Sequence, residues 1–82
     1  MKKIVNKEEL KNALIKYYND YYKDRFNDKD RERLVRMLTN SVFISLRSEC
    51  YSFMPCNNDT LITKIKEDSY EVEGSFAKDY IK

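Results

Sequence analysis

The chain has 82 residues, a net charge of +2 and a hydrophobic fraction of 41%, which fits one small soluble domain over residues 1–82. A domain of this size has little core to bury. The sequence contains no histidine and one glycine, so it lacks the usual general base and the glycine-rich loops that hold nucleotides. We therefore expect a protein that is not an enzyme and that uses no cofactor and no metal.

The sequence also predicts where the protein acts. No apolar run is long enough for a membrane span, and the basic start of the chain is followed by no apolar signal-peptide core. We expect a cytoplasmic protein, in which Cys50 and Cys56 stay reduced. Residue types with AT-rich codons (Lys, Asn, Ile, Tyr) are frequent and those with GC-rich codons are scarce. This bias indicates a low-GC bacterium or its phage, and hence a bacterial or phage-infected cell.

The first helix is predicted over residues 7–25. Asn6 can cap its start, and Glu9 stands three residues later, at the spacing of a capping box. The apolar residues fall in two neighbouring arcs of the helix surface. One arc holds Leu10, Ala13, Leu14, Tyr17 and Tyr21, and the other holds Ile15, Tyr18, Tyr22 and Phe26.

Together the two arcs are wider than the stripe that a helix needs to lie on a core. Tyrosine is enriched at protein interfaces and at their hot spots. We therefore expect Tyr18, Tyr22 and Phe26 to contact a partner, the alternative being burial under the rest of the fold.

A second helix is predicted over residues 28–48, capped by Asp28. Its core face carries Leu34, Val35, Leu38, Val42 and Leu46. Two alternatives remain open: a strand at 41–45, or a break at 39–41 that starts a third helix.

Arginines gather on the opposite side of this second helix, at Arg33, Arg36 and Arg47. Arginine binds phosphates and carboxylates through a bidentate fork. Phe43 and Ile44 border the stripe, as apolar residues often do around arginines at interfaces. We predict that the three arginines bind a partner, the alternative being an ordinary solvated helix face.

A loop at 50–59 and an antiparallel hairpin over about 60–76 are predicted next. Leu61, Thr63 and Ile65 are expected on the face that meets the helices, and Lys64 or Lys66 opposite Glu71 on the outer face. Gly74 is interpreted as a bulge or a close backbone approach. The tail from 77 onward is expected to pack back or to add a short strand.

The predicted fold class is therefore α+β, with two helices, or three if the second one breaks, packed against a C-terminal antiparallel β-hairpin. The leading functional hypothesis is a small inhibitor or adaptor that blocks a host protein by occupying its surface. The AT-rich signature suggests a phage or mobile-element accessory protein, anti-CRISPR-like in its action, with a nucleic-acid-processing complex as one class of target.

Two alternatives are kept. A winged-helix DNA-binding regulator requires a break in the second helix, and the acidic hairpin tip at 67–68 counts against it. The other is an oligomeric structural component, and a homodimer through the aromatic face is compatible with the sequence. Direct contact with nucleic acid is thus a secondary expectation, and no membrane partner is expected.

Overall fold

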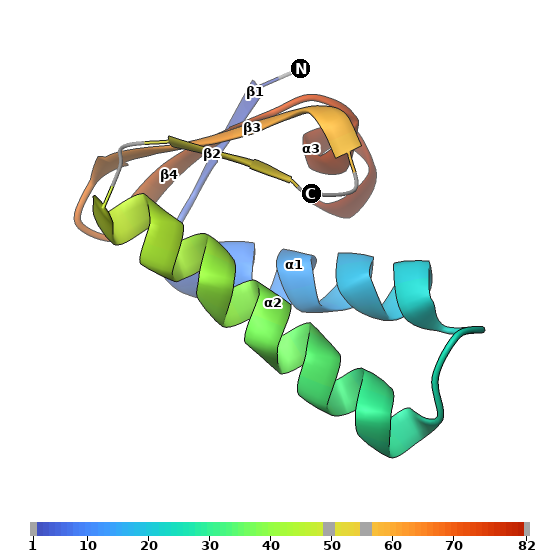
Figure 1. Ribbon diagram of the computed structural model, residues 1–82. Helices are drawn as coiled ribbons and strands as arrows, with labels where there is room; N and C mark the ends of the chain where they lie inside the picture. The colour runs from blue at the N-terminus through green and yellow to red at the C-terminus, as the bar shows by residue number, and fades with distance from the viewer. Residues whose placement is uncertain (1, 49–50, 55–56, 82) are drawn as a thin grey trace.

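The computed structural model describes residues 2–48, 51–54 and 57–81. In chain order the elements are β1 (Lys2–Val5), α1 (Lys7–Tyr22), α2 (Asp28–Ser48), β2 (Tyr51–Met54), β3 (Asn57–Lys66), β4 (Ser69–Glu73) and α3 (Ser75–Tyr80). The strands form one four-stranded sheet in the order β1-β4-β3-β2, antiparallel at every pairing. The helices α1 and α2 lie on one side of it (Figure 1). The α+β class, with N-terminal helices and a C-terminal hairpin, is confirmed.

The first helix begins as the sequence predicted. The backbone N–H of Glu9 donates to Asn6 Oδ1 at 2.8 Å, and Asn6 N–H donates to Glu9 Oε1 at 3.1 Å, which completes the capping box. Asp68, in the β3–β4 turn, also accepts a bond from Lys7 N–H at 2.9 Å, so the turn and the helix start are fixed together. The helix ends at Tyr22, three residues earlier than predicted, because the chain turns back toward α2.

The second helix is continuous from Asp28 to Ser48, so neither the strand at 41–45 nor the break at 39–41 occurs. Its cap was predicted one residue too late. Asn27 caps it, since Asp30 N–H donates to Asn27 Oδ1 at 2.9 Å. Asp28 instead forms an ion pair with Arg31 at 2.7 Å.

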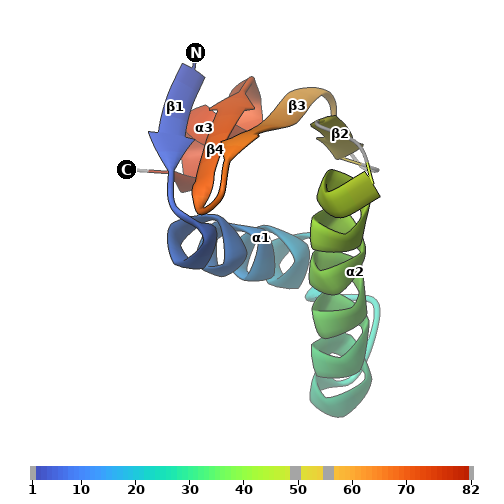
Figure 2. The same ribbon diagram turned by 90° about the vertical axis from the view of Figure 1, so that its left-hand side faces the viewer.

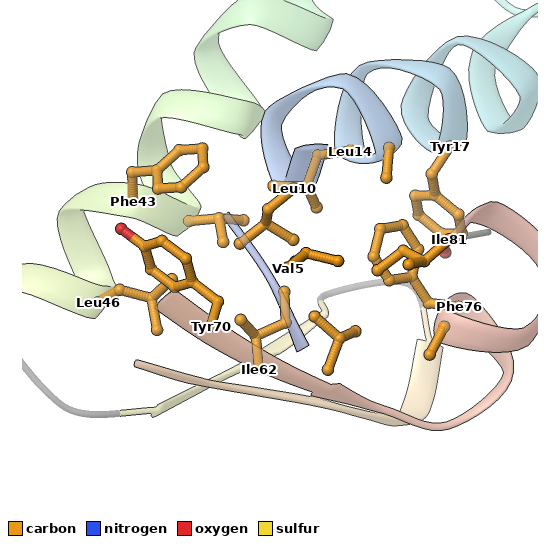
Figure 3. Packing of buried hydrophobic residues seen from close by; sticks show 14 of the residues in the cluster. Val5, Leu10, Leu14, Tyr17, Phe43, Leu46, Ile62, Tyr70, Phe76 and Ile81 are labelled. Atoms are coloured by element: carbon orange, nitrogen blue, oxygen red, sulfur yellow. The ribbon is translucent and has the colours of Figure 1, made fainter. Parts of the chain in front are cut away.

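The core lies between the sheet and the two long helices (Figure 3). Leu10 and Leu14 of α1 and Ile62 and Val72 of the sheet have no exposed surface. From α2 the core receives Val35, Val42 and Leu46 of the predicted face together with Phe43, while Leu34 and Leu38 are only partly buried. The first half of α2 projects beyond the sheet (Figures 1 and 2), which leaves one side of this helix in solvent.

The predicted hairpin lies about three residues earlier than expected, over residues 57–73 rather than 60–76, and has a different register. The strands β3 and β4 end at Lys66 and Glu73, and Lys64 lies opposite Tyr70 rather than opposite a glutamate. In β3, Thr60 and Ile62 face inward and have no exposed surface, whereas Ile65 is 50% exposed on the outer face. The expected pairing and inner face of β3 are therefore wrong.

Three elements were not predicted. The strands β1 and β2 extend the hairpin on both edges, with β2 inside the segment that was expected to be a loop. Cys50 and Cys56, which flank β2, lie outside the described residues. The tail does pack back, but as the short helix α3, which starts at Ser75 inside the expected hairpin and buries Phe76 and Ala77.

Gly74 makes the predicted close backbone approach. Its φ is +100°, and a Cβ at this position would lie 2.2 Å from the carbonyl oxygen of Asp59. The Asp59 carboxylate accepts bonds from the Ser75 hydroxyl at 2.8 Å and from the Ser75 N–H at 3.2 Å. These bonds lower the pKa of Asp59 below its usual 3.8, and they hold the start of α3 against β3.

Candidate functional site

The aromatic residues of α1 are distributed between core and surface. Tyr18 is fully buried, so its predicted contact with a partner is wrong. Tyr22 is partly buried against the core, while Phe26 keeps 44% of its surface exposed beyond the end of the helix. Tyr18 is covered because α1 packs against the sheet and also against α2, so both apolar arcs have a neighbour.

The other arc packs on α3, which sequence reasoning did not foresee. The Tyr17 ring meets Phe76 and Tyr80 edge to face, with centroids 5.6 Å and 5.4 Å apart. Tyr80 donates its hydroxyl to Asp20 at 3.1 Å. Internal packing therefore accounts for most of the wide apolar surface of α1, and a partner is not needed to explain it.

The outward side of α2 is the more distinctive surface. At about 100° per residue, Arg33, Arg36 and Arg47 fall on one side of the helix, as predicted, and Met37 and Ile44 border them. Met37 and Ile44 are each 58% exposed, so they rank among the most exposed large apolar residues in the described part of the chain. The sequence pattern of α2 contained Met37 on this side, but only Ile44 was noted.

Three adjoining hollows follow this surface. One lies along the outside of α2, with a volume of about 570 Å³, and a second lies between α1 and α2, with about 510 Å³. The third, of about 330 Å³, joins the start of α1 to the end of α2. Asn40 lines all three, and Arg36, Lys11 and Ile44 are each shared by two of them. We call the surface lined by these three hollows the basic groove.

The basic groove concentrates positive charge. Six of the 16 basic side chains of the chain line it, namely Lys7, Lys11, Lys29, Arg33, Arg36 and Arg47. Among its described lining residues, only Glu32 of the 14 acidic side chains is present. Glu32 forms an exposed ion pair with Arg36 at 3.3 Å, which is weak because water screens both groups. The groove thus carries a clear positive excess on a nearly neutral protein.

Two of these cations come from α1, and the sequence pattern of α2 could not assign them to the site. Lys7 and Lys11 stand one turn apart at the start of α1. The ammonium of Lys7 lies 5.6 Å from the ring centroid of Phe43, so it rests over an α2 aromatic at the end of the groove. The packing of α1 against α2 brings these lysines beside Arg47.

Within residues 2–48, 51–54 and 57–81, no group of three or more His, Cys, Asp or Glu side chains is placed to hold a metal ion. None of the described helices combines the length and the apolar character of a membrane span. Lysines and arginines beside exposed apolar side chains can bind carboxylates or phosphates and cover an apolar surface.

Comparison of the chain with protein-family models, with curated proteins and with solved structures gave no match.

Proposed function

We propose that this protein is a small, non-catalytic binding protein that acts by covering an acidic surface of a protein partner with the basic groove. The observation that carries this proposal is the position of Met37 and Ile44, which are exposed along one edge of the six cations. Methionine and arginine are both enriched at protein interfaces, and a fully covered apolar patch forms the core of such an interface. The cations would steer an acidic partner and fix its register, while the apolar pair supplies desolvation energy.

A protein fits this surface better than a nucleic acid does. Phosphate contacts need cations but gain nothing from exposed aliphatic side chains. Proteins that bind single strands stack bases on aromatic rings, yet the exposed rings of Tyr21 and Phe26 lie at the α1–α2 turn, outside the groove. The winged-helix alternative required a break in α2, and α2 is continuous.

A second copy of the chain is a poor occupant of the groove. In a two-fold symmetric contact the same surface meets itself, so the cations of one basic groove would face the cations of the other. Like charges brought together in this way cost several kcal/mol, on the order of the whole gain from a small apolar centre. The oligomeric structural role is therefore less well supported than binding to a different, acidic protein.

We further propose that the partner is a host protein in the cytoplasm of a bacterial or phage-infected cell. The AT-rich residue usage and the small size support a phage or mobile-element origin. In that setting an inhibitor would block a nucleic-acid-processing complex, in an anti-CRISPR-like manner, by occupying a surface the complex needs.

The test is capture from nuclease-treated lysate of a low-GC bacterium, followed by mass spectrometry. The groove variant is Arg33→Glu with Arg47→Glu, and the matched control is Lys66→Glu with Lys78→Glu, which changes net charge equally at exposed positions on β3 and α3. We expect wild type and control to retain one abundant partner and the groove variant to lose it, with circular dichroism unchanged. Equal capture by the groove variant, or recovery of material that nuclease removes, would contradict the proposal.

A further inference from the structure

The recess between α1 and α2 is lined by a threonine whose hydroxyl is buried without a hydrogen-bond partner in the described part of the chain. Thr39 lines the recess and is only 2% exposed, and its Oγ1 has no hydrogen-bond partner among the described residues. A helical threonine commonly donates this hydroxyl to the carbonyl one turn earlier. A buried hydroxyl without a partner opposes folding, and such groups often mark functional positions.

The surroundings of Thr39 define what the recess can accept. Ile15 and Val35 are its apolar lining residues, and apart from Thr39 the other lining residues are two cations, one carboxylate and two amides, namely Lys11, Arg36, Glu32, Asn19 and Asn40. An apolar side chain alone would leave the Thr39 hydroxyl without a hydrogen-bond partner, and a basic side chain would be repelled by Lys11 and Arg36. A side chain with a short methylene stem and a terminal carboxylate can make all three interactions: the stem packs against the apolar lining, and the carboxylate accepts a hydrogen bond from the hydroxyl and pairs with the cations.

We propose that this recess is the specificity pocket of the basic groove and receives a glutamate or aspartate side chain of the protein partner. The inference rests on the proposed function and adds to it a named chemical group and a named receptor residue. The Thr39 hydroxyl, which is covered in the free protein, turns about χ1 and donates a hydrogen bond to the incoming carboxylate, and Arg36 leaves its exposed pair with Glu32 to bind the same carboxylate. Because that pair is solvent-screened, the exchange costs little.

Thr39→Val separates this role from a structural one, because it keeps the shape of the side chain and removes only the hydroxyl. If the hydroxyl serves the partner, its removal raises the midpoint of thermal unfolding and weakens binding at the same time. If the hydroxyl serves the fold, its removal lowers the midpoint. Thr39→Ser, which keeps the hydroxyl, is the matched control.

The probe is a short fluorescent peptide with glutamate and leucine at helical spacing, compared with the same peptide in which every glutamate is glutamine. Binding is measured by fluorescence anisotropy at physiological salt. We expect the acidic peptide to bind, Thr39→Val to weaken it about tenfold, and Thr39→Ser to stay within about twofold of wild type. We expect the glutamine peptide to bind wild type and Thr39→Val equally weakly.

The outcomes distinguish the recess from the groove. If Thr39→Val binds the acidic peptide like wild type while Arg33→Glu with Arg47→Glu abolishes binding, the recess proposal is overturned and the groove stands. Both proposals are contradicted if the acidic peptide fails to bind wild type. They are also contradicted if the peptide binds the variant Arg33→Glu with Arg47→Glu as well as it binds wild type. A lowered unfolding midpoint in Thr39→Val also overturns the recess proposal.

Discussion

Met37 and Ile44 allow the sharpest quantitative prediction for binding. Complete burial of such a side chain is worth about 1.5–3 kcal/mol. Each of the two residues has 58% of its surface exposed in the free protein, so covering both would contribute about 2–3 kcal/mol to the free energy of binding. Replacing both by serine should therefore weaken partner binding roughly 30- to 150-fold. The free energy of unfolding should change by no more than about 0.5 kcal/mol per site, because neither side chain supports the core.

The assay is titration calorimetry with the captured partner, alongside urea denaturation of the free protein. Ile4 and Ile65, on the outer face of the sheet, are 68% and 50% exposed and provide the control pair. Their replacement by serine should leave the affinity unchanged. Unchanged affinity in the groove pair, or an equal loss in the control pair, would refute the assignment of the binding surface to α2.

Three further predictions concern the fold that carries the groove. Gly74→Ala should lose about 2–4 kcal/mol in urea denaturation, because it combines a strained φ with a collision against the Asp59 carbonyl; a loss below about 0.5 kcal/mol would disprove that contact. Asp59 has a lowered pKa because the Ser75 hydroxyl donates to it, so its contribution to stability is complete above pH 3.8 and disappears as the pH falls through the lowered value. Asp59→Asn should be less stable at neutral pH and lose less stability on acidification, and parallel stability–pH curves for the two proteins would contradict this. Asn6→Ala should cost about 1 kcal/mol through loss of the capping box, and an unchanged denaturation midpoint would contradict it.

The helices could be predicted because their signals are local. The Asn6 and Glu9 cap and the spacing of Val35, Val42 and Leu46 lie within single segments, and each is confirmed. The continuity of α2 follows from the same uninterrupted spacing. The cap of α2 was misplaced by one residue because Asn27 and Asp28 are both good capping residues.

The rest of the sheet depends on contacts between distant segments. In β3, Leu61 and Ile62 are both apolar, so alternation alone cannot tell which one faces the core, and pairing with β4 decides it. The strand β1 is four residues long and is stabilised by β4 at the other end of the chain. The start of α3 depends on Asp59, which precedes Ser75 by 16 residues.

The same distinction applies to the binding surface. Arg33, Arg36 and Arg47 could be predicted to share a side because they belong to one helix. Tyr18 was placed wrongly because its burial is decided by the packing of α1 against other elements, not by its own segment. The packing of α1 against α2 also adds Lys11 to the groove and creates the recess at Thr39, and no periodicity predicts such a junction.

The most direct test of the proposed binding surface is cross-saturation NMR on the complex between the methyl-labelled protein and its captured partner. The exposed methyl groups of Met37 and Ile44 report on the groove, and those of Ile4 and Ile65 report on the outer face of the sheet. We predict that saturation of the partner attenuates the Met37 and Ile44 signals and leaves those of Ile4 and Ile65 unchanged. Attenuation confined to the sheet methyls would contradict the central claim that the partner binds the basic groove.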